Sequence, residues 1–180
     1  APAPVQNKLA DELVFYNWAD YMPQSVLDAF TAEYGVKVIY MTYRSMEEAV
    51  AQVRAGQIYD VAVLENNNIK PLAAEGLLAK IDYQNVPNFK NISPNFRDLA
   101  FDPGNRNSIP HDYGTTGLVV DSDLVDPLVT RWADLWDPRL DGKIAVRALS
   151  YELIGLSLKS LGYPLNSEDP QQMEAALQHL

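Results

Sequence analysis

The sequence predicts an α/β fold in which a parallel sheet carries helices on its faces. Two observations predict it. Short apolar runs alternate with stretches of helical spacing through the first half of the chain, and the helical stretches end at glycines such as Gly35 and Gly76. Repetition of strand, helix and strand places successive strands parallel in one sheet.

Four strands are predicted in this half from runs rich in β-branched and aromatic residues. They cover residues 13–17, 36–43 and 59–64, with an edge strand over residues 77–81. Because parallel strands end at the same edge of a sheet, the segments that follow them share that edge. Open α/β sheets bind ligands there.

The intervening helices follow from spacing and end signals. A helix over residues 24–34 ends at Gly35, and its apolar face comprises Val26, Leu27, Phe30 and Tyr34. Ser45 and Glu48 form a capping box for a helix that runs to about residue 55. Its inward positions are Met46, Ala49, Val50 and Val53. A short helix is expected over residues 70–75.

The second half is organised differently. Residues 82–108 are polar, irregular and rich in proline and asparagine, which is typical of a surface excursion. Residues 108–121 form a long extended segment that we expect to cross between two lobes, with glycines that let the backbone bend. We therefore expect a first lobe over residues 1–110, and the crossover strand with a partial second lobe over residues 111–180.

The second lobe is predicted to hold few elements. They are a short helix over residues 132–136, a strand over residues 142–147, a helix capped by Ser150 that ends at Gly162, and a final helix that begins at Pro170. This set is too small for a complete lobe, so the chain is expected to be truncated. That would allow two copies to complete each other's sheet as a domain-swapped homodimer.

Composition excludes several functions. A net charge of −10 argues against a nucleic-acid partner, and the absence of cysteine excludes disulfides, thiolate metal sites and cysteine nucleophiles. No stretch is apolar enough to span a membrane. The start, Ala1-Pro2-Ala3-Pro4, lacks the features of a signal peptide and is interpreted as a mature or trimmed terminus, or a linker.

The residues after the first strand suggest a ligand. Trp18, Asp20 and Tyr21 place two electron-rich rings around one carboxylate at the binding edge of the sheet. Such a set suits an organic ammonium ion, through cation–π contacts and a salt bridge. Packing and helix capping are the ordinary alternative roles for these residue types.

Several motifs carry a resemblance to a known family. The most specific is Asn17-Trp18-Ala19-Asp20-Tyr21, supported by Tyr59-Asp60-Val61-Ala62-Val63, Ser108-Ile109-Pro110, and Trp132-Ala133-Asp134-Leu135-Trp136. With these motifs in order along nearly the whole chain, it resembles the polyamine-binding proteins, of the spermidine/putrescine type, of bacterial ABC transporters. The resemblance implies a periplasmic-binding-protein-like fold of two lobes that close over a polyamine.

The resemblance also implies roles for residues. It places Trp18 and Tyr21 on the aliphatic chain of the amine, Asp20 on one ammonium group, and Glu152 on an amine from the second lobe. Glu65 and Asn67 are secondary candidates, in a segment that departs from the small residues usual in the family. It further implies an extracytoplasmic or periplasmic location, an ABC-transporter permease as partner, and neither a cofactor nor a metal.

Three other classes of function are alternatives. An enzyme would have to use His111, but no nucleophile elbow or phosphate loop accompanies it. A ferric-ion binder would use tyrosines such as Tyr16, Tyr21, Tyr43 and Tyr113, yet tyrosines at strand ends are usually packing. A sensor or docking domain of the same fold stays open as the main alternative.

Overall fold

A computed structural model describes residues 9–126 and 129–180. The chain divides into two compact units, one ending at Tyr113 and the other beginning at Gly114, and each is described by itself. The interpretation of Ala1–Pro4 as a trimmed terminus lies outside the described residues. None of the helices in the described part of the chain has the length and apolarity that a bilayer crossing demands.

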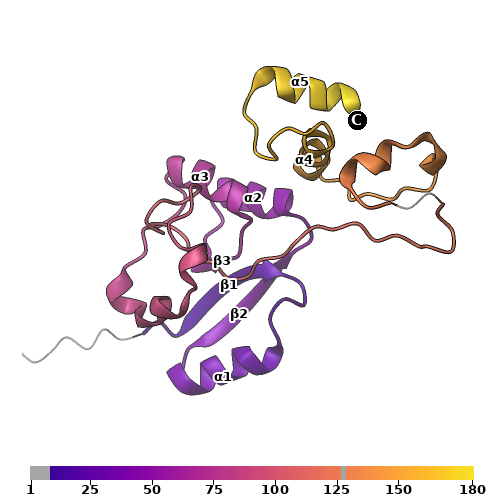
Figure 1. The fold of residues 1–180 in the computed structure, drawn as a ribbon. Coiled ribbons are helices and arrows are strands. Elements are labelled where there is room, and N and C mark those ends of the chain that lie inside the picture. Colours follow the sequence, from indigo (N-terminus) through magenta and orange to yellow (C-terminus); the bar gives the residue numbers. More distant parts are fainter. Residues whose placement is uncertain (1–8, 127–128) are drawn as a thin grey trace, which may run out of the picture. The chain divides into compact units, whose positions relative to one another are not determined.

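The first unit is built on a three-stranded parallel sheet (Figure 1). Its strands are β1 (Glu12–Trp18), β2 (Lys37–Tyr43) and β3 (Val61–Ala62), in the order β2-β1-β3. The register pairs Phe15 with Tyr40 and Trp18 with Tyr43. The parallel sheet and its flanking helices confirm the predicted α/β fold class.

Three helices flank this sheet, with α1 on one side and α2 and α3 on the other (Figure 1). They are α1 (Gln24–Tyr34), α2 (Met46–Arg54) and α3 (Asn66–Ala74). As predicted, α1 ends at Gly35, whose φ of 68° is left-handed. Also as predicted, the Ser45 side chain caps α2 by accepting the Glu48 N–H. The Glu48 carboxylate accepts the N–H of Arg44 rather than that of Ser45, so the second half of the predicted capping box does not form.

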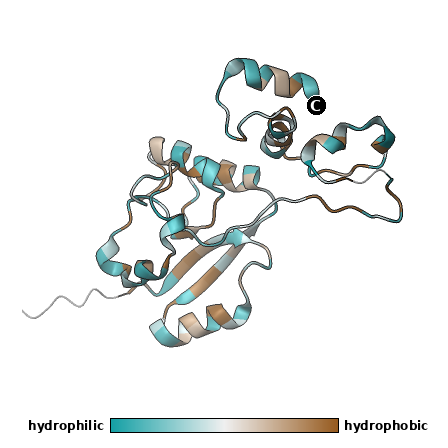
Figure 2. Cartoon of the chain, in the orientation of Figure 1, coloured by the Kyte–Doolittle hydropathy of each residue, from teal (hydrophilic) through white to brown (hydrophobic). Residues whose placement is uncertain are grey.

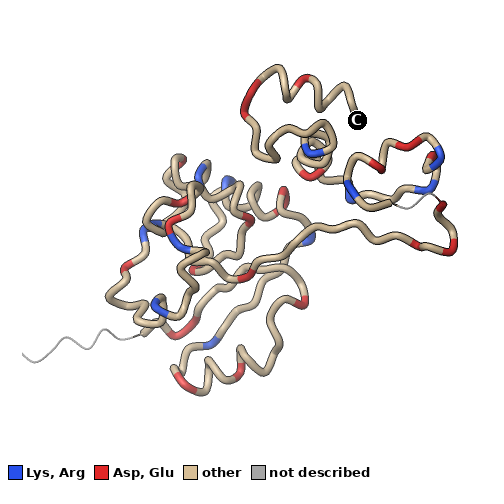
Figure 3. The backbone as a smooth tube through the Cα atoms, viewed as in Figure 1, with Lys and Arg blue, Asp and Glu red and all other residues tan. Residues whose placement is uncertain are grey.

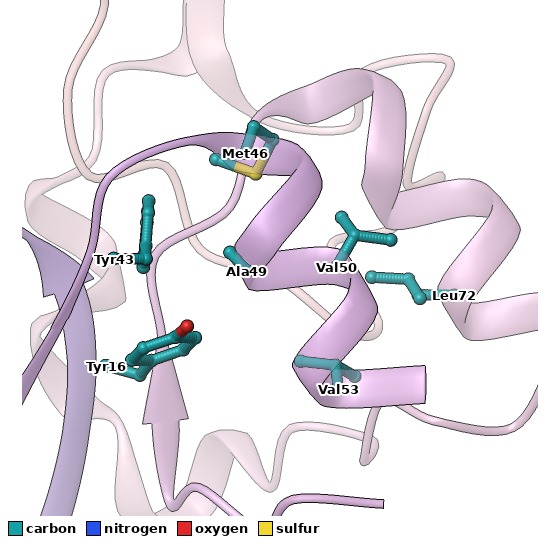
Figure 4. Packing of buried hydrophobic residues seen from close by; sticks show 7 residues of the cluster. All are labelled: Tyr16, Tyr43, Met46, Ala49, Val50, Val53 and Leu72. Carbon is teal, nitrogen blue, oxygen red and sulfur yellow. The ribbon is translucent and has the colours of Figure 1, made fainter. Parts of the chain in front are cut away.

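The core lies between the sheet and α2 and α3 (Figure 4). Its buried members are Tyr16, Tyr43, Met46, Ala49, Val50, Val53 and Leu72, and Figure 2 shows hydrophobic residues along the strands. The four inward positions predicted for α2 are all buried. The predicted apolar face of α1 is largely wrong, because only Leu27 is buried and Val26 and Tyr34 are each 49% exposed.

Three predicted boundaries in this unit are wrong. The third strand is two residues long rather than residues 59–64. The helix expected over residues 70–75 begins at Asn66, so Pro71 lies inside it. Residues 77–81 form no strand, and the side-chain amide of Asn107 donates to the Leu78 and Ala79 carbonyls, which a neighbouring strand could otherwise bond.

The excursion after residue 81 is ordered by short helices and one buried acid. Its 3₁₀ helices are η1 (Tyr83–Asn85), η2 (Pro87–Asn91) and η3 (Pro94–Phe96). Asp102 is 5% exposed and accepts bonds from the Asn107 N–H at 3.0 Å and from the N–H and hydroxyl of Ser108, each at 2.7 Å. These bonds fix the backbone where the extended segment begins.

The second unit is helical in its described part. Its elements are η4 (Trp132–Trp136), η5 (Pro138–Leu140), α4 (Ser150–Ser160) and α5 (Pro170–His179). The two α-helices pack together around Leu158 and Ala176, both buried, and the Ser157 hydroxyl donates to the Ala176 carbonyl at 2.7 Å. Asp169 caps α5 with its side chain.

The predicted strands of this half are wrong for the described residues. Neither residues 108–121 nor residues 142–147 form a strand, and several of their apolar side chains are exposed, with Val119 at 100% and Val146 at 54%. A strand depends on a neighbour to take its backbone bonds, and no such neighbour pairs with them here. Ser150 is the first residue of α4 rather than its cap, since Leu149 occupies the cap position.

Candidate functional site

The candidate site lies where the strands of the first unit end. All three strands are parallel, so the segments that follow β1, β2 and β3 meet at one edge of the sheet. The central strand β1 delivers Trp18 to this edge, and Asp20 and Tyr21 form the turn behind it. Trp18, Asp20 and Tyr21 therefore lie at the edge of the sheet where the sequence predicts them.

A row of aromatic rings connects the core to this edge. The Tyr16 ring stacks on Tyr59 with centroids 4.1 Å apart and contacts the Tyr43 ring at 4.9 Å. Tyr43 lies 4.6 Å from the Trp18 ring, which lies 6.3 Å from that of Tyr21. Tyr43 is 1% exposed and Tyr21 is 52% exposed. The row therefore runs from the interior to the surface.

Asp20 is the acid of this edge. It is exposed, and its φ of 63° lies in the left-handed region that few residues other than glycine adopt. Within the described residues its carboxylate has no hydrogen bond or ion pair with the protein. Its charge helps to raise the pKa of Tyr40, for which burial is the larger cause. Asp20 is therefore a carboxylate that is open to a cation.

Glu65 lies at the same edge, after β3. It occupies the N-cap position of α3 without making a side-chain cap bond. Burial is the main cause that raises the pKa of Tyr43, and the charge of the Glu65 carboxylate is the next. A second negative charge is thus available near the aromatic row.

The segment that holds Asn67 differs from the prediction. It was expected in a loop, but it lies in the first turn of α3, where its side-chain oxygen accepts a bond from Asn68 at 2.8 Å. Asn67 is exposed. A ligand that used this oxygen would share it with Asn68.

Glu152 belongs to the second unit, in the first turn of α4. Its carboxylate pairs with the Arg147 guanidinium at 3.0 Å, and its side chain is 16% exposed. Glu152 therefore already has a cationic partner within its own unit.

The residues of the other function classes have other surroundings. Tyr43 is buried and its hydroxyl donates to the Val63 carbonyl at 2.5 Å. Tyr16 is 3% exposed, and burial is the main cause that raises its pKa to about 12. Both are core residues rather than ferric-ion ligands. His111 is exposed, and no group of three or more histidine, cysteine, aspartate or glutamate residues that could hold a metal ion occurs in the described residues.

Two residues at this edge were missed by the sequence analysis. The Tyr40 hydroxyl donates to the Trp18 carbonyl at 2.7 Å, and the Asn17 side chain accepts the Trp18 N–H at 2.8 Å. The pairing of Phe15 with Tyr40 brings that hydroxyl to the edge. The aromatic content of the second strand was the only signal for Tyr40.

Charges over the two units follow no single sign. Figure 3 shows lysine, arginine and acidic residues spread over both units. Acidic residues number 24 and basic residues 14, which gives the net charge of −10. The general field therefore favours a cationic ligand, but discrimination has to come from the groups at the edge itself.

Comparisons with known proteins point to one family. Residues 25–180 match the model of a family described as bacterial extracellular solute-binding protein. The chain is 40% identical over 171 residues to the spermidine/putrescine-binding periplasmic protein of Escherichia coli K12, and 38% identical over 173 residues to that of Salmonella typhimurium. These matches cover 93% and 94% of this chain but 49% and 50% of the relatives.

Solved structures give the same result. A putative spermidine/putrescine ABC transporter protein from Listeria monocytogenes matches with a TM-score of 0.83 at 35% identity. The Tp0655 lipoprotein of Treponema pallidum matches with a TM-score of 0.84 at 30% identity. The Listeria match covers 94% of this chain and the Treponema match 92%, and each covers 53% of the solved chain. The chain thus spans about half the length of the curated relatives it matches, and the resemblance seen in its motifs is confirmed.

Proposed function

The chain belongs to the family of bacterial extracellular solute-binding proteins, and we propose that it captures a polyamine, such as spermidine or putrescine, for uptake by an ABC transporter. Relatives of 38% and 40% identity are named for spermidine and putrescine binding in the periplasm. The proposed role is binding without catalysis, in the periplasm or another extracytoplasmic space, with release to a membrane permease.

One observation carries the proposal: at the carboxyl edge of the sheet, next in the chain to two aromatic rings, Asp20 has an exposed carboxylate without a hydrogen bond or ion pair in the described residues. Asp20 would pair with one ammonium group, while Trp18 and Tyr21 contact the adjoining methylenes and the charge. Each buried methylene contributes about 0.8 kcal/mol, and a desolvated cation–π contact adds about 2 kcal/mol. A ligand with a cation on an aliphatic chain uses all three groups.

Glu65, Asn67 and Glu152 are proposed as further contacts. Glu65 is the best supported of them, because its charge acts on the same Tyr43 that packs against Trp18. It would take a second ammonium group. Glu152 would have to exchange its Arg147 partner for an amine, so its contribution is expected to be smaller than that of Asp20.

Two alternatives are less well supported. A sensor or docking domain of the same fold would not need the open carboxylate at Asp20, and the relatives' names favour amine capture. A domain-swapped homodimer is a separate proposal about this chain. Light scattering tests it, and a monomeric mass would exclude it.

Isothermal titration of the intact protein with putrescine and spermidine tests the function. We expect saturable binding. Asp20→Asn should weaken it at least tenfold, because a charge-assisted bond is lost, and Trp18→Ala should weaken it as well. Asp28→Asn is the matched control, since Asp28 is an exposed acid of the same unit that bonds Gln24. Butane-1,4-diol, which has the carbon chain without charge, should not bind. An intact protein that binds no di- or polyamine would overturn the proposal.

A further inference from the structure

The peptide groups on either side of Trp18 are held by side chains. The Trp18 N–H donates to Asn17 Oδ1 at 2.8 Å, and the Trp18 carbonyl accepts the Tyr40 hydroxyl at 2.7 Å. We call Asn17 and Tyr40 together the Trp18 clamp. Its two members come from different strands, β1 and β2.

The topology of the sheet explains why a side chain, rather than a strand, bonds the Trp18 N–H. The carbonyls of Val14 and Tyr16 accept bonds from the β3 side, from Asp60 and Val63. Alternation along a strand turns the Trp18 backbone to that same side, but β3 ends at Ala62. The Trp18 N–H therefore has no strand residue beside it on that side, and the Asn17 side chain supplies the acceptor.

Both members of the clamp are packed against neighbouring groups. Asn17 is completely buried, and its side chain acts to lower the pKa of the Tyr40 hydroxyl, against the larger effect of burial, which raises it. The Tyr40 ring packs edge-on against Phe15 with centroids 5.5 Å apart, which fixes the position of its hydroxyl. The charge of Asp20 acts on that hydroxyl. The clamp thus adjoins the acid of the proposed site.

The turn that follows depends on where the Trp18 peptide lies. Asp20 has a positive φ two residues later, a conformation that costs a non-glycine residue free energy and that contacts around the turn therefore help to hold. We propose that Asn17 and Tyr40 are positioning residues of the amine site, which fix the turn so that Asp20 and the rings of Trp18 and Tyr21 meet the ligand together. This inference rests on the proposed function and deepens it.

Tyr40→Phe is the sharpest test, because it keeps the ring on Phe15 and removes only the hydroxyl. In the intact protein we expect the dissociation constant for putrescine to rise about tenfold, the size of one hydrogen bond's effect on the turn. Tyr83→Phe is the matched control. It removes a tyrosine hydroxyl that likewise donates to a backbone carbonyl, that of Asn105, elsewhere in the unit. The putrescine affinity of Tyr83→Phe should stay within twofold of that of the parent protein.

A second measurement does not need ligand. Amide hydrogen exchange at Trp18, followed by NMR, should be faster in Asn17→Ala, which removes the acceptor of that N–H, and in Tyr40→Phe, but unchanged in Tyr83→Phe. Tyr40→Phe keeps the test available if Asn17→Ala does not fold.

The outcomes separate the two proposals. Unchanged putrescine affinity in Tyr40→Phe, or an equal loss in Tyr83→Phe, overturns the positioning role while the proposed function stands. If the parent protein binds no amine, both the proposed function and the positioning role fail. The exchange rates then show whether the clamp itself holds the Trp18 peptide.

Discussion

Replacing Tyr43 tests how the core supports the candidate site. The side chain is 1% exposed, contacts the rings of Trp18 and Tyr16 at 4.6 and 4.9 Å, and donates to the Val63 carbonyl. Removal of a buried aromatic side chain costs about 3–5 kcal/mol. Tyr43→Phe keeps both ring contacts and loses only the hydrogen bond, for about 1 kcal/mol.

Urea unfolding of the intact protein, followed by circular dichroism, measures these costs. With a slope of about 2 kcal/mol per molar urea, Tyr43→Ala should lower the midpoint by roughly 2 M and Tyr43→Phe by roughly 0.5 M. Tyr34→Ala is the control, because Tyr34 is 49% exposed and contacts only Phe30 among the described rings, at 4.8 Å. Its midpoint should fall by less than about 0.5 M. Equal shifts for the two alanine variants would refute the assignment of Tyr43 to the core.

Two further predictions concern the second unit. The Arg131 guanidinium and the N–H of Thr130 lower the pKa of Asp134 to about 2, so this pair supports the fold above about pH 4, and the support is lost as the pH falls toward 2. A carboxyl NMR titration should show the Asp134 midpoint rising in Arg131→Gln but not in Arg139→Gln, and an unmoved midpoint in both contradicts the pairing. Asp169 accepts the N–H groups of Gln171 and Gln172 at 2.8 and 3.1 Å, so Asp169→Ala should cost about 1 kcal/mol in urea unfolding, whereas Asp169→Asn, which keeps the acceptor, should cost much less.

Local features were predictable because they depend on neighbouring residues in the sequence. The end of α1 at Gly35 and the cap of α2 at Ser45 both follow from a few adjacent side chains. The placement of Trp18 at the end of a strand is of the same kind. These features needed no knowledge of what packs against them.

Features that depend on distant partners were not predictable. Residues 142–147 have the composition of a strand, but a strand also needs a neighbour, which composition does not encode. The start of α3 was missed because three asparagines are typical of a loop and Pro71 of a first turn. The Tyr40 contribution to the site was missed because it depends on the register between β1 and β2.

The aromatic row makes stability and affinity inseparable at one position. Tyr43 is both a buried core residue and the ring against which Trp18 packs. Tyr43→Ala should therefore weaken putrescine binding even under conditions where the protein stays folded, because the Trp18 ring loses its support. Tyr34→Ala should leave binding unchanged. Titration in the absence of urea checks this, and wild-type affinity in a folded Tyr43→Ala variant would show that the Trp18 clamp suffices to hold the site without the core beneath it.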